Sequence, residues 1–144
     1  MFFGRHYKAI DEKGRVKIPS LFKKALDRKD EETLVLTNFA NTIRVYPLNE
    51  WDMLRARSKD LHTNARNKLA SDRFFFSSVI MVNVDKQGRF LIPNALRTET
   101  GLVEQIVILG LDYRFEIWDL DKWDAYQETI DKEEIVEDLV DEGY

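Results

Sequence analysis

The chain contains no cysteine among its 144 residues, and only two histidines, three prolines and six glycines. Without cysteine there is no disulfide framework, no thiol nucleophile and no zinc–thiolate site. No apolar run of about eighteen residues occurs, so we expect no membrane-spanning helix. No apolar core follows residues 1–5, so we expect no signal peptide there. These absences together predict a cytoplasmic protein.

Sequence signals for catalysis and for cofactor binding are also sparse. His6 and His62 lie far apart, and neither belongs to a Ser or Cys pattern of a nucleophilic enzyme. The glycines form neither of the two phosphate-cradling patterns, Gly-x-x-x-x-Gly-Lys and Gly-x-Gly-x-x-Gly. The aspartates of the second half match no metal-binding loop. We therefore expect no enzyme, no metal site and no cofactor.

Charge is unevenly distributed along the chain, although the net charge is only −4. Residues 1–30 carry nine Lys or Arg and four Asp or Glu, a balance of +5. Residues 31–118 are balanced, and residues 119–144 carry two Lys against eleven acidic residues, a balance of −9. The basic first part is compatible with a nucleic-acid partner. The acidic tail solubilises the chain, repels DNA from the wrong face, or docks onto the basic surface of a neighbour. Its apolar residues predict an amphipathic terminal helix.

One motif is present twice. Asp11–Pro19 reads DEKGRVKIP and Asp85–Pro93 reads DKQGRFLIP, so both share Asp-x-x-Gly-Arg-x-x-Ile-Pro. Further blocks also repeat, because Leu34–Asn38 matches Ile106–Gly110, and Ile43–Trp51 matches Phe115–Trp123. The chain is therefore predicted to consist of two versions of one small unit.

The repeated blocks predict a β-rich α+β fold. Short segments rich in β-branched and aromatic residues predict the strands His6–Ile10, Val16–Ile18, Leu34–Thr37, Ile43–Tyr46, Val79–Val84, Phe90–Ile92, Ile106–Leu109 and Phe115–Trp118. Apolar residues at helical spacing predict the helices Ser20–Leu26, Asn49–Arg57 and Thr63–Phe74.

The predicted organisation is a first repeat at 1–51, a helical connector at 52–78, a second repeat at 79–126 and an acidic C-terminal tail at 127–144. A repeat of this size rarely buries enough apolar surface to fold alone. We therefore expect the two copies to pack together, with hairpins exchanged between them, into one pseudo-symmetric core. Trp51 and Trp123 hold equivalent places in the repeats and should both be buried.

The Asp-x-x-Gly-Arg turn is the candidate functional element. Gly14 provides the positive φ that a tight turn between strands often needs, and Asp11 can accept hydrogen bonds from the turn's backbone. Arg15 follows directly and has the geometry for bidentate contact with phosphate or guanine. Alternate residues Lys13, Arg15 and Lys17 would share one face of an extended segment and could form a DNA-reading β-ribbon. Alternatively, the Asp–Arg pairs only fix the turns.

Other basic residues accompany the two turns. Arg5 and Lys8 precede the first turn, whereas the second copy retains only Lys86 and Arg89 beside Asp85. Its Gln87, Phe90 and Leu91 replace charged or smaller residues, so the second copy is the weaker candidate.

The doubled motif, followed by Phe115–Asp119 and Trp123, resembles the MraZ family over nearly the whole chain. This resemblance implies two SpoVT-AbrB-type repeats that form a swapped-hairpin barrel with peripheral helices. It also implies a cytoplasmic, nucleoid-associated transcription regulator. Asp11 and Arg15 then fall on the family's DNA-binding Asp-x-x-x-Arg motif, and Asp85 and Arg89 on its second copy.

The resemblance further implies the partners. They are a ring of identical chains and double-stranded DNA carrying short direct repeats, upstream of a division and cell-wall gene cluster that includes the protein's own gene. Repression is favoured over activation. The alternative is an antitoxin-like or other interaction module that binds a partner through the acidic tail. Phe74–Phe76 is interpreted as core or subunit interface rather than as a base-stacking platform, because no basic residue interleaves it.

Overall fold

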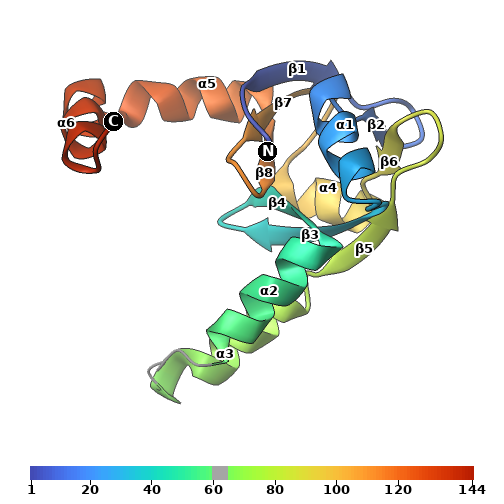
Figure 1. Cartoon of the computed structure of the whole chain (residues 1–144), viewed down its shortest axis with the longest axis horizontal. Coiled ribbons are helices and arrows are strands. Elements are labelled where there is room, and N and C mark those ends of the chain that lie inside the picture. The colour runs from blue at the N-terminus through green and yellow to red at the C-terminus, as the bar shows by residue number, and fades with distance from the viewer. Residues whose placement is uncertain (60–64) are drawn as a thin grey trace.

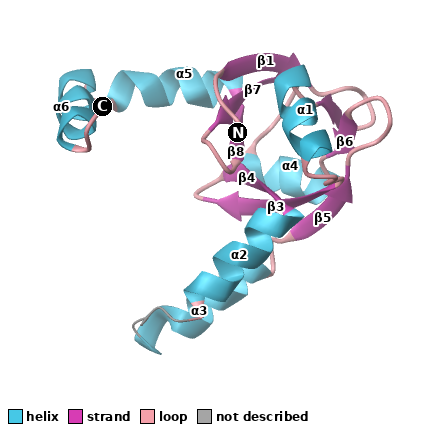
Figure 2. Ribbon diagram, viewed as in Figure 1, coloured by secondary structure: helices cyan, strands magenta, loops and turns pink. Residues whose placement is uncertain are grey.

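The computed structural model describes residues 1–59 and 65–144, and Figure 1 and Figure 2 show their arrangement. The elements are β1 (Arg5–Ala9), β2 (Arg15–Lys17), α1 (Ser20–Arg28), β3 (Thr33–Phe39), β4 (Thr42–Pro47), α2 (Leu48–Ser58), α3 (Ala65–Phe76), β5 (Ile80–Asn83), β6 (Arg89–Leu91), α4 (Asn94–Thr100), β7 (Gln105–Gly110), β8 (Phe115–Asp119), α5 (Leu120–Thr129) and α6 (Lys132–Asp141). The order strand–strand–helix–strand–strand–helix therefore occurs twice, with α3 between the halves and α6 after them.

The strands form two sheets. Six of them make one antiparallel sheet in the order β1-β7-β8-β4-β3-β5, and β2 pairs with β6 in a separate two-stranded ribbon. In the described part of the chain the edge strands β1 and β5 do not pair with each other, so the sheet does not close into the expected swapped-hairpin barrel. The sheet stays open because β2 and β6, which follow the two edge strands, leave it and pair with each other.

Proline sets the start of three helices. Pro19, Pro47 and Pro93 directly precede α1, α2 and α4, with φ between −54° and −58°. A residue that lacks an N–H and has a fixed φ suits this position. In the second repeat, Asp119 occupies the place of Pro47 and caps α5 by accepting a hydrogen bond from the Lys122 N–H. The two repeats thus begin equivalent helices by different chemistry.

A single core joins the two repeats. Phe2 and Phe22 of the first half contact Phe115 of the second, with ring centroids 5.3 and 5.2 Å apart. Val16 and Phe90, from the two ribbon strands, are buried in the same cluster. The apolar side of the ribbon therefore faces the core, and its other side faces solvent.

On the face of the sheet that points away from this core, each repeat packs one tryptophan. Trp51 of α2 packs on Val35, and Trp123 of α5 packs on Val107. Their exposed fractions are 3% and 8%, so the predicted burial of both tryptophans is confirmed.

Two helical arms leave this body (Figure 1). The first is the α2–α3 hairpin, which matches the predicted helices except that residues 63–64 of the second prediction lie outside the described residues, as does His62. The second is α5 followed by α6, and α6 confirms the predicted terminal helix. The arms extend in different directions from the sheet.

Candidate nucleic-acid interface

The first Asp-x-x-Gly-Arg turn is held by one carboxylate. Oδ1 of Asp11 accepts hydrogen bonds from the backbone N–H groups of Lys13 and Arg15, at 2.9 and 2.8 Å. Its Oδ2 accepts one from Nε of Arg15 at 2.9 Å, within an ion pair. Gly14 closes the turn with φ +86°, the left-handed region that its sequence position predicts.

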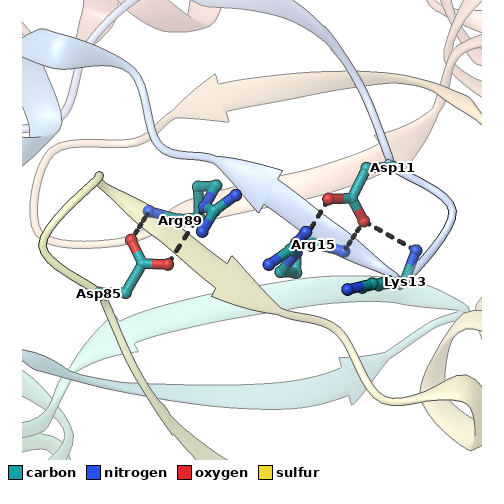
Figure 3. A network of polar contacts seen from close by, with 5 residues as sticks. All are labelled: Asp11, Lys13, Arg15, Asp85 and Arg89. Atoms are coloured by element: carbon teal, nitrogen blue, oxygen red, sulfur yellow. Dashed lines mark hydrogen bonds and ion pairs between the residues drawn. The ribbon is translucent and has the colours of Figure 1, made fainter.

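The second turn repeats this geometry closely. Asp85 accepts hydrogen bonds from the backbone N–H groups of Gln87 and Arg89, both at 2.9 Å, and from Nε of Arg89 at 3.1 Å. Gly88 has φ +75°. Both Asp–Arg pairs are therefore real ion pairs, and Figure 3 shows them side by side on the ribbon.

The ribbon exists because the two copies of the motif pair with each other. Arg15 lies opposite Leu91, and Lys17 lies opposite Arg89. Each turn also binds the strand end of the other copy: the Ile18 N–H donates to the Gly88 carbonyl at 2.8 Å, and the Ile92 N–H donates to the Gly14 carbonyl at 2.9 Å. Neither repeat could build this element alone.

The outer face of the ribbon is basic. The pleat alternates, so Val16 and Phe90 point into the core while the paired residues Arg15, Lys17 and Arg89 point out. Residues 11–17 and 85–91 carry five basic and three acidic side chains, a balance of +2 in a chain whose net charge is −4. The remaining residues therefore have a balance of −6, which comes from the acidic residues 119–144.

The ion pairs leave donors free. Within each guanidinium group, the carboxylate binds only Nε: Asp11 binds that of Arg15, and Asp85 binds that of Arg89. Within residues 1–59 and 65–144 the terminal Nη atoms of both groups have no hydrogen-bond partner. Each arginine side chain is 31% exposed. An arginine held on its Nε side by a carboxylate is preorganised to present its Nη donors to an anion or a base edge. Fixing the turn and contacting a ligand are thus compatible roles.

The environment of the two carboxylates keeps them ionised. The Arg15 backbone N–H, followed in importance by the Arg15 guanidinium, holds the pKa of Asp11 below its ordinary value of 3.8. The Arg89 backbone N–H and guanidinium lower the pKa of Asp85 in the same way. Both carboxylates are therefore charged throughout the neutral range.

Arg97 of α4 is a positioning residue that the sequence analysis missed. Its Nε donates to the Ile92 carbonyl at 2.9 Å, and its guanidinium lies only 2.9 Å from where a Cβ on Gly14 would stand. Arg97 follows Lys23 by 74 residues, the same offset as the motif, and only this comparison could have singled it out. The second repeat thus supports the turn of the first.

The remaining candidates lie in different places. Lys13 and Lys86 are exposed in the two turns, and Lys8 is half-buried on β1. Arg5 begins β1 but lies away from the ribbon, with its guanidinium 5.4 Å from the Trp123 ring and Nη1 3.4 Å from Oε1 of Gln127. The structure therefore brings Lys13, Arg15, Lys17, Lys86 and Arg89 together, and leaves Arg5 outside.

Comparison of the sequence with known protein families also finds two repeats in the chain. The profile of the family described as "MraZ protein, putative antitoxin-like" matches the chain twice, at residues 1–74 and 75–142. The chain belongs to the MraZ family. The resemblance inferred from the doubled motif is thereby confirmed.

Curated MraZ relatives are similar over nearly their full length. The "Transcriptional regulator MraZ" of Acetivibrio thermocellus is 38% identical over 141 residues, 96% of both chains. The protein of the same name from Pelotomaculum thermopropionicum is 40% identical over 144 residues, covering 98% of this chain and 97% of its own. That of Clostridium tetani is 37% identical over 145 residues, 99% of each.

Two further structural findings concern other classes of site. Among residues 1–59 and 65–144, no three His, Cys, Asp or Glu side chains cluster as a metal ion would require. No helix in the same ranges has the length and apolarity to cross a membrane.

Proposed function

We propose that this MraZ-family protein is a sequence-specific, DNA-binding transcriptional regulator, and that the outer face of the β2–β6 ribbon contacts the DNA. The observation that carries the proposal is the paired presentation of Arg15 and Arg89. Both are fixed by a carboxylate, both have Nη donors without a partner among the described residues, and both lie on the solvent side of one ribbon.

The two-stranded form of the ribbon suits this role. The major groove of B-DNA admits a two-stranded β-ribbon, and arginine binds the O6 and N7 atoms of guanine through two parallel hydrogen bonds. In this arrangement Arg15 and Arg89 read bases, while Lys13, Lys17 and Lys86 contact phosphates on either side. The carboxylates of Asp11 and Asp85 act on DNA indirectly, by orienting the arginines. Arg5 and Lys8 are secondary candidates for backbone contacts.

The family resemblance gives the biological setting of the proposal. The target is DNA with short direct repeats upstream of the division and cell-wall gene cluster, including the protein's own gene, and the protein represses it. The acting form is a ring of identical chains in the cytoplasm, associated with the nucleoid. A repeated target favours such a ring, because weak single contacts reinforce one another through effective concentration.

A second candidate function is an antitoxin-like interaction module. It is favoured by the acidic α6, which has no buried residue, and by the words "antitoxin-like" in the family description. In that case a partner protein would bind the tail, and the ribbon would show no base preference.

Fluorescence anisotropy separates the two functions. Labelled duplex from directly upstream of the protein's own gene is compared with a shuffled duplex of equal length at the same salt concentration, because affinity for DNA depends steeply on salt. We expect selective binding to the upstream duplex. Equal binding to both duplexes, or binding to neither, would reject the proposal and leave the interaction module.

A further inference from the structure

The terminal helix α6 is amphipathic but packs against nothing in the described chain. Ile135, Val136, Leu139 and Val140 lie at helical spacing on one side and remain between 40% and 61% exposed. The helix has only ten residues and is well capped, since Asp131 accepts hydrogen bonds from two backbone N–H groups. Isolated helices of this length are marginally stable in water. Burial of its exposed apolar side against a partner would therefore stabilise α6.

A groove of matching character lies on the other arm. It is formed by the inner sides of α2 and α3 with the β3–β4 turn, and encloses about 590 Å³. Trp51, Leu54 and Phe75 form its apolar floor, and Phe74 and Phe76 stand at its edge, 61% and 46% exposed. Among the described residues, Phe75 meets the expectation that this phenylalanine run forms core or interface, because it packs on Trp51, and the ring of Phe76 also meets Trp51 edge-on.

Charge complements the apolar match. Helix α6 carries five acidic residues and one lysine, a balance of −4, and the acidic residues occupy the side opposite its apolar stripe. Residues 48–59 and 65–76 of the groove arm carry six basic and three acidic residues, a balance of +3. Arg55, Lys68 and Asp72 line the groove itself, and Lys68 forms an ion pair with Asp72, so the lining has a balance of +1. A helix seated by its apolar side would bring its acidic flanks toward this basic rim.

The two surfaces are on different arms of the same chain, which extend in different directions (Figure 1). The structure leaves each without a covering element, so a second copy of the chain is the occupant that satisfies both. We propose that the apolar side of α6 docks in the α2–α3 groove of a neighbouring copy. Such a contact joins unlike surfaces head to tail, so an open assembly keeps a free α6 at one end and a free groove at the other until it closes.

Complementation between two full-length variants tests this contact. Phe74→Asp places a charge in the groove, and Leu139→Asp places one on the apolar side of α6. The mass of each variant, of the wild type and of an equimolar mixture is measured by light scattering after gel filtration, in the absence of DNA. Leu21→Asp, at a residue 62% exposed, and Val103→Asp, at one 80% exposed, are the matched controls.

The proposal predicts that the wild type and both controls are larger than one chain, whereas each variant alone elutes as one 17.0 kDa chain. The mixture should form a species of two chains, because one variant supplies an intact α6 and the other an intact groove. A monomeric wild type, an unchanged mass for either variant, or a mixture that remains monomeric would overturn the proposal.

Two features keep this test decisive. Circular dichroism checks that the variants are folded, and Phe76→Asp with Val140→Asp replaces the first pair if either is not. The inference rests on the proposed self-association and not on DNA binding. Because the masses are measured without DNA, failure of the ribbon to bind DNA would leave this result unaffected, and loss of the contact would leave the ribbon intact.

Discussion

Replacing Arg15 by alanine should weaken DNA binding while leaving the fold intact. The side chain is 31% exposed, and its Nε–Asp11 ion pair lies at the surface, where such pairs add little to stability. Asp11 still accepts the backbone N–H groups of residues 13 and 15 in the variant, because neither bond involves the guanidinium. The turn and the β2–β6 pairing should therefore persist.

The expected loss of DNA-binding free energy follows from the two hydrogen bonds that the guanidinium can donate to a base. Loss of two parallel hydrogen bonds to a base costs about 1–3 kcal/mol, or roughly 5- to 150-fold in Kd. An assembly that binds several boxes would multiply this loss across its copies, so the measurement uses a duplex that carries a single box. Arg15→Lys sharpens the test, because an ammonium keeps the charge but cannot pair with Asp11 and also offer a planar fork of donors.

The assay is anisotropy titration of the upstream and shuffled duplexes at several salt concentrations. Arg15→Ala should lose selectivity between the two, and Arg15→Lys should retain the salt dependence while also losing selectivity. Lys24→Ala, on an exposed residue of α1 that lies outside the ribbon, removes the same charge and serves as the control. A folded Arg15→Ala protein with wild-type affinity and selectivity would refute the assignment.

Three further predictions concern the same element. Arg89→Ala should weaken binding to the single-box duplex less than Arg15→Ala does, because the second copy of the motif has Gln87 and Leu91 where the first has Lys13 and Lys17. An equal loss with an intact fold would show equal roles for the two copies. Gly14→Val should lower the free energy of unfolding by about 2 kcal/mol, since a β-branched residue resists the φ of +86°, and an unchanged denaturation midpoint would contradict this. The pKa of Asp11 is lowered, so its contribution to stability is complete above its ordinary pKa of 3.8 and is lost as pH falls through the lowered value. A carboxyl NMR titration should place the Asp11 inflection below 3.8, and an inflection at or above that value would show that the hydrogen bonds are absent in solution.

Much of the fold follows from local chemistry that the sequence displays. Strands and helices were predicted near their observed positions because β-branched runs, helical spacing and prolines act within a few residues. For instance, Pro19 and Pro93 hold equivalent positions in the two repeats and precede equivalent helices. Trp51 and Trp123 also hold equivalent positions, which predicts that both are buried. The expected barrel was wrong because closure depends on whether distant edge strands meet, which no local pattern encodes.

The sequence by itself determined the two turns. Each Asp-x-x-Gly-Arg unit makes these hydrogen bonds within five residues, so the carboxylate, the glycine φ and the oriented arginine are set locally in both copies. Only the tertiary structure decided that the two units form one surface. The pairing of Arg15 with Leu91 and the bond from Ile92 to Gly14 join residues more than seventy positions apart, and they form because burial of Val16 and Phe90 in a shared core draws both strands together. The placement of Arg97 beneath the first turn, and of Arg5 far from it, results from the same long-range packing.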